Sequence, residues 1–115
     1  MNKKQKGRFG EFLARMMFRF KGYRVIEENY VTGRGTTAGE IDFIAKKAHT
    51  IVFVEVKERQ TMENALYAIS EHQKERLKRA AKLYLARHPR YLDYDVRFDA
   101  VFVSKFKLKH IQNAF

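Results

Sequence analysis

Hydrophobic residues recur at helical spacing over the first twenty positions of the chain. Their period predicts a first helix that ends at the Gly22 break, with one apolar stripe that we expect to pack in the core. That stripe consists of Phe9, Phe12, Leu13, Met16, Met17 and Phe20. Residues 23–27 then predict a short first strand, and residues 29–38 predict a loop. Within that loop Arg34 stands between glycines and could approach a phosphate backbone, although a plain flexible loop is favoured.

The most hydrophobic segment spans residues 39–59 and predicts two strands joined by a hairpin turn. Side chains alternate between the faces of a strand, so Glu55 and Lys57 should share a face, with α-carbons roughly 6.5 to 7 Å apart. In the preceding strand Glu40 and Asp42 share a face. Antiparallel pairing would bring Asp42 beside Glu55. Two adjacent carboxylates repel, and one pKa would rise unless a hard cation such as Mg²⁺ lies between them.

A structural explanation of these charges is also open. Charged residues on an edge strand often serve to prevent aggregation between sheets. This explanation is weakened because the charges end the most hydrophobic segment of the chain, where a central strand is expected. A buried charge is costly unless it is paired or bound to a metal.

The next part of the chain predicts one long helix. A linker at residues 60–64 leads to the helix, which begins near Ser70 or an earlier polar residue and ends before Pro89. The face opposite the apolar one is basic, with Lys74, Arg76, Lys78, Arg79, Lys82 and Arg87. We treat most of it as a solvated surface. Gln73 and Lys74, near the helix start, are better placed to serve a site at the hairpin. The apolar face contains Ile69, Leu77, Ala80, Ala81, Tyr84 and Leu85.

The C-terminal part predicts a turn at residues 91–94 and then a strand at residues 96–103 that becomes apolar on both faces, as a central strand does. Asp99 in that strand is most simply a salt-bridge partner near Arg97 or a charge at the sheet end. The tail, residues 105–111, alternates basic and apolar side chains and predicts an edge strand or a segment that docks on a partner. The whole order predicts a single α/β domain over residues 1–115, with a central mixed β-sheet flanked by helices.

The composition narrows the class of protein. The absence of cysteine excludes thiolate zinc sites and cysteine nucleophiles, and it fits a reducing compartment. The formal net charge of +11 implies a polyanionic partner, for which nucleic acid is the obvious candidate and a membrane surface the alternative. No run of residues approaches the roughly 20 apolar residues of a membrane helix, and the start is not a convincing signal peptide. We therefore expect a soluble, cytoplasmic protein with no membrane partner.

Four motifs together resemble a known family. They are Gly7-Arg-Phe-Gly10-Glu11, Gly39-Glu-Ile-Asp42, Phe53-Val-Glu-Val-Lys57 and Arg97-Phe-Asp99. An acidic residue on a first helix, an aspartate on one strand and Glu-x-Lys on the next resemble the restriction-endonuclease-like, or PD-(D/E)XK, nuclease fold. More narrowly, the set resembles the bacterial YraN-like family of predicted nucleases over nearly the whole chain. This family is in turn similar to small archaeal Holliday-junction resolvases.

The resemblance implies a metal-dependent endonuclease that hydrolyses phosphodiester bonds in DNA, including branched or otherwise structured DNA. By that resemblance Asp42 and Glu55 would be carboxylate ligands of Mg²⁺ or Mn²⁺, helped by the backbone carbonyl of Val56. Lys57 would hold or help deprotonate the attacking water and stabilise charge on the phosphate. Glu11 would complete the site from the helix, directly or through water.

If the protein is such an endonuclease, we expect nucleic-acid contacts beside this centre from Arg59 and, by their place at the start of the basic helix, from Gln73 and Lys74. Glu58 departs from the small hydroxyl residue that the family often has at that position. Strand alternation should point Glu58 away from Lys57, so we expect little catalytic harm. We also expect the protein to read backbone or shape rather than sequence, and DNA against RNA is left open.

Two other classes of function remain in play. The first is a nucleic-acid-binding module that keeps the fold without useful turnover. The second is a structural partner protein that assembles through its apolar tail. A homodimer would suit a nuclease that cuts two strands, and Phe106 and Phe115 are candidates for its interface, although they could equally complete the core.

Overall fold

The computed structural model describes residues 1–33, 38–61, 69–105 and 107–115. Arg34 and Phe106, two of the residues considered above, lie outside these ranges, as does part of the predicted linker. The element order is α1 (Lys3–Phe20), β1 (Arg24–Val31), β2 (Glu40–Lys47), β3 (Thr50–Glu58), α2 (Glu71–Arg87), a 3₁₀ turn η2 (Pro89–Tyr91), β4 (Asp95–Ser104) and β5 (Lys107–Ile111).

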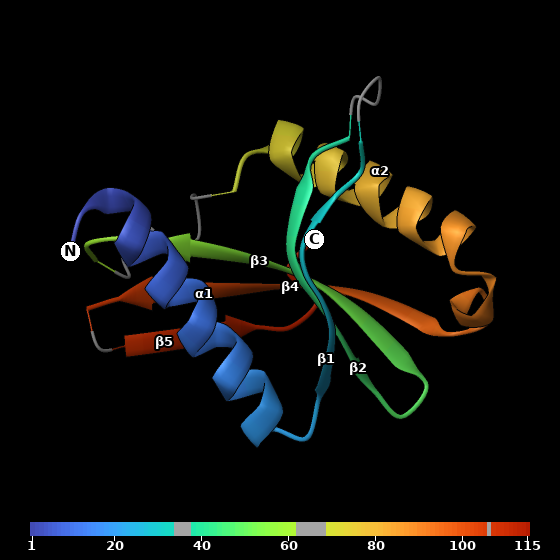
Figure 1. Cartoon of the computed structure of the whole chain (residues 1–115), viewed down its shortest axis with the longest axis horizontal. Coiled ribbons are helices and arrows are strands. Elements are labelled where there is room, and N and C mark those ends of the chain that lie inside the picture. Colours follow the sequence, from blue (N-terminus) through green and yellow to red (C-terminus); the bar gives the residue numbers. More distant parts are fainter. Residues whose placement is uncertain (34–37, 62–68, 106) are drawn as a thin grey trace.

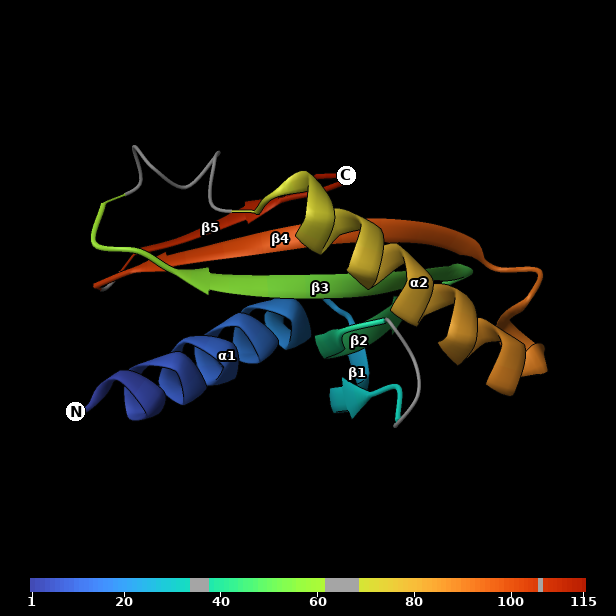
Figure 2. The same cartoon turned by 90° about the horizontal axis from the view of Figure 1, so that it is seen from above.

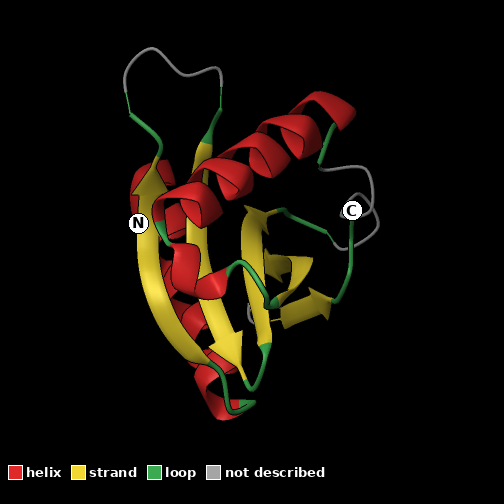
Figure 3. Ribbon diagram, turned by 90° about the vertical axis from the view of Figure 1, so that its right-hand side faces the viewer, coloured by secondary structure: helices red, strands yellow, loops and turns green. Residues whose placement is uncertain are grey.

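The five strands form one mixed sheet in the order β1-β2-β3-β4-β5 (Figure 1). The β3–β4 pair is parallel and the other pairs are antiparallel. Figure 2 shows α1 beneath β3 and β4, and Figure 3 shows helices on both sides of the strands. The predicted fold class, a central mixed sheet flanked by helices, is therefore confirmed. The predicted hairpin is confirmed as well, and β4 lies inside the sheet, between β3 and β5, as its two apolar faces predicted.

The ends of both helices follow from local hydrogen bonds. Asn2 caps α1 and Ser70 caps α2, and in each case the side chain of a glutamine three residues later accepts a hydrogen bond from the backbone N–H of the cap residue. Such reciprocal caps satisfy amide groups that the first helical turn leaves unpaired. Gly22, with φ of 92°, reverses the chain after α1 in a conformation that favours glycine. Helix α2 ends at Arg87, before Pro89, as predicted.

Strand β1 is longer than the sequence predicted. It runs through residues 29–31, which were expected to belong to a loop. Asn29 adopts a positive φ of 50°, and the pairing of β1 with β2 shifts register between Val25 and Glu27. These irregularities interrupt the alternation from which a strand is recognised. The prediction of a loop starting at residue 29 is therefore wrong at its N-terminal end.

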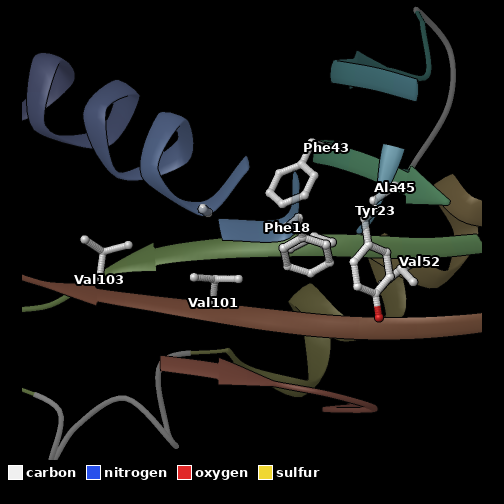
Figure 4. Packing of buried hydrophobic residues seen from close by; sticks show 9 residues of the cluster. Phe18, Tyr23, Phe43, Ala45, Val52, Val101 and Val103 are labelled. Carbon is white, nitrogen blue, oxygen red and sulfur yellow. The ribbon is translucent and has the colours of Figure 1, made fainter. Parts of the chain in front are cut away.

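The core face of α1 differs from the predicted stripe. Gly10, Ala14 and Phe18 are buried, and Leu13 and Met17 pack beside them. Figure 4 shows Phe18 between Phe43 and Tyr23, with ring centroids 5.1 and 4.8 Å from theirs. The helix packs closely on the sheet at Gly10, where a Cβ atom would lie 3.5 Å from the Val103 side chain, an ordinary contact distance.

The predicted burial of the other four stripe residues is wrong. Phe9, Phe12, Met16 and Phe20 are 45, 46, 36 and 86% exposed. Helix α1 is apolar on two faces, so helical spacing alone does not indicate which face meets the sheet. Helix α2 behaves as predicted, because Leu77, Ala80, Ala81 and Tyr84 pack on the opposite face of the sheet, against Ile44, Ile51 and Phe53.

The C-terminal residues return to the core. Strand β5 pairs with β4 at the sheet edge, as predicted for the tail. The Phe115 ring packs against Phe98 with centroids 5.4 Å apart, and Ala114 N–H donates to the Phe98 carbonyl oxygen. Phe115 thus completes the core, the second of the two roles considered for it. Among the described residues, no helix is long and apolar enough to cross a membrane.

Candidate active site

Asp42 and Glu55 lie where β2 and β3 separate. The backbone pairing of the two strands includes Phe43 with Val54, and the next position along this register places Asp42 opposite Glu55. The backbone N–H of Val56 donates to Asp42 Oδ2 at 2.7 Å. The side chain of Asp42 therefore joins the two strands beyond the last backbone pair. The predicted proximity of these two carboxylates follows directly from the antiparallel register of β2 and β3.

Lys57 completes this group from the same strand as Glu55. Its Nζ lies 3.3 Å from Glu55 Oε1, and the two side chains are 18 and 13% exposed. Both continue the strand face that carries Ile51 and Phe53, which pack under α2. The prediction that Glu55 and Lys57 share a face is confirmed.

The two carboxylates are unfavourably placed as charged groups. Burial, and after it the charge of Glu55, raises the pKa of Asp42 from 3.8 to about 8, against the opposing hydrogen bond from Val56. Burial also raises the pKa of Glu55, although the Lys57 ammonium opposes the rise. One lysine thus faces two acidic groups, and the local negative charge is incompletely compensated.

Glu11 reaches toward the group from α1, the other helical layer. Its Oε1 is buried, with no hydrogen-bond partner among the described residues. Burial raises the pKa of Glu11, and its charge in turn raises the pKa values of Asp42 and Glu55. The described residues contain no group of three histidine or acidic side chains arranged to hold a metal ion. Glu11 thus influences the carboxylate pair from α1, and its part in the site, directly or through water, stays a prediction.

A cavity of about 290 Å³ opens over the carboxylates. Its lining includes Asp42 and Glu55 from the sheet and Gln73 and Arg76 from α2. Gly39 lies beside Arg76, because a Cβ atom at that position would be 3.5 Å from the Arg76 guanidinium, an ordinary contact distance. Arg76 was assigned by sequence to the solvated basic face. Its spacing of three residues from Gln73, which places both on one helix face, was the signal that could have identified it.

The three predicted nucleic-acid contacts have different surroundings. Gln73 lines the cavity, but its side chain also accepts a hydrogen bond from Ser70 N–H at 3.1 Å. Lys74 pairs with Glu71 at 3.1 Å, and Arg59 donates to the carbonyl oxygen of Glu58 at 2.6 Å. Neither Lys74 nor Arg59 is among the described residues that line the cavity. The structure thus brings one of the three to the carboxylates.

Asp99 belongs to a separate cluster under the C-terminal end of α1. It is fully buried and receives two hydrogen bonds of 2.8 Å from Arg97 and one of 3.0 Å from Asn113 N–H. His110 Nε2 lies 2.7 Å from Asp99 Oδ2. Burial alone would raise the pKa of Asp99, but hydrogen bonds from His110 and Arg97 outweigh it, and the pKa falls below its ordinary value. The predicted Arg97 pairing is confirmed, and the alternative of a charge at the sheet end is wrong.

Comparison with known proteins places the chain in a family. The model of the uncharacterised protein family UPF0102 matches residues 10–103, which include Glu11, Asp42, Glu55 and Lys57. A UPF0102 protein of Paramagnetospirillum magneticum is 39% identical over 111 residues, covering 96% of this chain and 86% of its own length. UPF0102 proteins of Methylocella silvestris and Methylorubrum extorquens are 41 and 40% identical, over 90 and 96% of this chain and 81 and 84% of their own lengths. The chain belongs to the UPF0102 family, as its YraN-like motifs indicated.

Proposed function

We propose that this protein is a divalent-metal-dependent endonuclease of the restriction-endonuclease-like, or PD-(D/E)XK, type that hydrolyses phosphodiester bonds in DNA. The observation that carries this proposal is the opposed pair Asp42 and Glu55 with the Lys57 ammonium 3.3 Å from Glu55. Two carboxylates buried side by side cost folding free energy. Arrangements of side chains that destabilise a fold are common at functional sites. The resemblance of the motifs to nuclease motifs supports metal-dependent phosphodiester hydrolysis as the function of this site.

The donor set fits a hard cation such as Mg²⁺ or Mn²⁺. Asp42 and Glu55 would hold it, because their oxygens are the ligand type that these ions prefer and their negative charge is incompletely compensated. Mg²⁺ commonly binds through one or two carboxylates and keeps several waters, which suits a pair rather than a cage of protein ligands. The Val56 carbonyl remains a proposed third ligand. When bound, the ion would lower the pKa of a water molecule and offset negative charge on the phosphate.

The protein's own side chains would orient the reactants. Lys57, held beside Glu55, would position the attacking water and stabilise charge on the phosphate while the water oxygen bonds to phosphorus and the bond to the leaving sugar oxygen breaks. Arg76, on the α2 side of the cavity, would pair with a non-bridging phosphate oxygen. Glu11 Oε1, which has no hydrogen-bond partner among the described residues, would accept a hydrogen bond from water ordered beside the pair.

The charge of the chain supports a polyanionic substrate. A formal net charge of +11 on 115 residues favours association with the phosphate backbone. Three acidic side chains line the cavity, so the basic surface would attract the substrate while a bound cation would offset repulsion at the cavity itself. This arrangement predicts binding that weakens steeply with salt.

Cleavage of labelled DNA tests the proposal. Linear duplex, single-stranded and four-way-junction DNA would be incubated with Mg²⁺ or Mn²⁺ and the wild type, Asp42→Asn or Lys57→Ala. Glu58→Gln, which removes an exposed carboxylate at the end of the same strand, is the matched control. We expect metal-dependent cleavage by the wild type and the control, and rates at least about 100-fold lower for the other two variants.

The second candidate function is a nucleic-acid-binding module without turnover. It predicts that the wild type leaves every substrate intact while binding DNA as well as Asp42→Asn does. That result would overturn the nuclease proposal.

A further inference from the structure

The solvent face of α1 carries large apolar side chains. Phe9, Phe12, Met16 and Phe20, here called the α1 stripe, follow one another at helical spacing and are all exposed. They lie opposite Gly10, Ala14 and Phe18, which pack on the sheet. Large contiguous apolar patches are rare on the surface of soluble monomers, and they often mark interaction surfaces. The α1 stripe is therefore a candidate interaction surface.

Two rings of the α1 stripe are arranged as a platform. The rings of Phe9 and Phe12 are nearly parallel, with an interplanar angle of 19° and centroids 6.4 Å apart. Each side chain is close to half exposed, so a flat group can reach the rings from solvent. Exposed aromatic rings beside a basic groove are the means by which proteins bind unpaired bases without sequence preference.

Such a groove lies on the neighbouring flank of α1. A cavity of about 520 Å³ has four basic residues in its lining, Lys3, Lys4, Arg8 and Arg15, together with the acidic residues Glu11 and Glu40. At 100° per residue Arg8 is about 40° around the helix from Phe12, so the basic groove and the α1 stripe adjoin. Arg15 also pairs with Glu28 at 3.2 Å.

Glu40 connects this groove to the candidate active site. It lines both the groove and the cavity that contains Asp42 and Glu55. Glu11, which lines the groove, also influences the pKa values of both carboxylates. A strand lying along the basic groove would therefore pass Glu40 and enter the cavity above the carboxylates.

We propose that α1 binds a single-stranded segment of nucleic acid, with phosphates in the groove at Lys4 and Arg8 and unpaired bases on Phe9 and Phe12. The inference rests on the proposed nuclease function, because the groove would lead the bound strand to the Asp42–Glu55 cavity. The expected substrate class is DNA with a single-stranded segment beside the cleavage position. Duplex DNA buries its bases against one another and cannot present them to the two rings.

Charge distinguishes this occupant from a second copy of the chain. Helix α1 contains six lysines and arginines and one glutamate. Two such helices packed through their α1 stripes would bring like charges together, whereas a polyanion neutralises them. A vesicle surface with anionic lipids is the remaining partner that a basic helix would fit, and binding to phosphatidylserine vesicles is measured alongside nucleic-acid binding.

Fluorescence anisotropy with full-length protein in EDTA separates binding from cleavage. The probes are a labelled single strand of about 20 nucleotides and the matching duplex. We expect Phe9→Ser with Phe12→Ser to weaken single-strand binding at least about tenfold and duplex binding less than about twofold. Leu92→Ser, which removes another exposed apolar residue, is the control for the aromatic pair. It should leave both affinities unchanged.

The salt dependence tests the groove. Lys4→Gln with Arg8→Gln should reduce the slope of log affinity against log salt concentration by about 1.4 for the single strand, since each neutralised phosphate contributes about 0.7. Lys82→Gln, on the exposed face of α2, is the matched control for loss of a positive charge. It should leave the slope within about 0.2 of the wild type.

Three results would overturn the proposal. One is single-strand affinity unchanged by Phe9→Ser with Phe12→Ser. The second is conversion of a dimer to a monomer by that variant with binding intact, which would make the α1 stripe a self-association surface. The third is that Phe9→Ser with Phe12→Ser abolishes binding to phosphatidylserine vesicles while nucleic-acid binding stays intact. Failure of the nuclease proposal is distinct, because a wild type that cuts no DNA would leave these binding measurements interpretable.

Discussion

Replacing Asp42 by asparagine should stabilise the metal-free protein at alkaline pH. Burial, followed by repulsion from Glu55, raises the pKa of Asp42 from 3.8 to about 8. Between these two values the folded protein holds a proton that the unfolded chain releases. The stability linked to this proton is therefore fully present below about pH 4 and is lost as the pH rises through about 8.

The size of the effect follows from the same two pKa values. The difference between 3.8 and about 8 corresponds to about 6 kcal/mol, at about 1.4 kcal/mol per pKa unit. The asparagine amide keeps an oxygen that can accept the 2.7 Å hydrogen bond from Val56 N–H, and it carries no charge. Allowing for readjustment of Glu55 and Lys57, we expect a gain of at least about 2 kcal/mol, which raises the melting temperature by about 8 °C in a domain of this size.

Thermal unfolding followed by circular dichroism provides the assay. Wild type, Asp42→Asn and the control Glu58→Gln would be melted in EDTA at about pH 4 and about pH 8. The gain for Asp42→Asn should appear at the higher pH and vanish at the lower one. Mg²⁺ at the higher pH should raise the melting temperature of the wild type and leave that of Asp42→Asn unchanged. A variant less stable than the wild type at the higher pH, or equally stabilised at both, would refute the reasoning.

Three further substitutions probe other parts of the structure. Asp99→Asn should cost about 3–5 kcal/mol in urea unfolding, because it removes the charge that pairs with Arg97; a cost below about 1 kcal/mol would contradict this. Gly10→Ala should stabilise by about 0.5–1 kcal/mol, since the added Cβ would meet Val103 at 3.5 Å, an ordinary contact distance; a lower melting temperature would show a tighter helix–sheet contact. Arg76→Gln should slow DNA cleavage at least about tenfold while leaving the melting temperature unchanged, and unaltered cleavage would remove Arg76 from the site.

The hairpin could be predicted well because strand geometry has a period of two. Once Asp42 and Glu55 are assigned to adjacent antiparallel strands, the register that places them opposite each other is limited by the short turn. The same period places Lys57 on the face of Glu55. Local rules were therefore sufficient for the carboxylate pair and its lysine.

Features that depend on tertiary packing could not be predicted in this way. Helix α1 has two apolar faces, and the face with Gly10, Ala14 and Phe18 is the one that packs on the sheet. Arg76 joins the cavity because of the way α2 crosses the sheet. Asp99 is matched by His110, whose position depends on the pairing of β5 with β4. Each of these contacts joins elements that are distant in sequence.

The measurement that tests the central claim most directly combines Mn²⁺ binding with cleavage on the same samples. Mn²⁺ would be titrated into the wild type, Asp42→Asn and Glu58→Gln, with binding followed by electron paramagnetic resonance and cleavage followed on labelled DNA. We expect the wild type and Glu58→Gln to gain cleavage in step with bound Mn²⁺, and Asp42→Asn to lose both. Unchanged Mn²⁺ binding or persistent cleavage in Asp42→Asn would contradict the assignment of Asp42 and Glu55 as the metal-dependent centre.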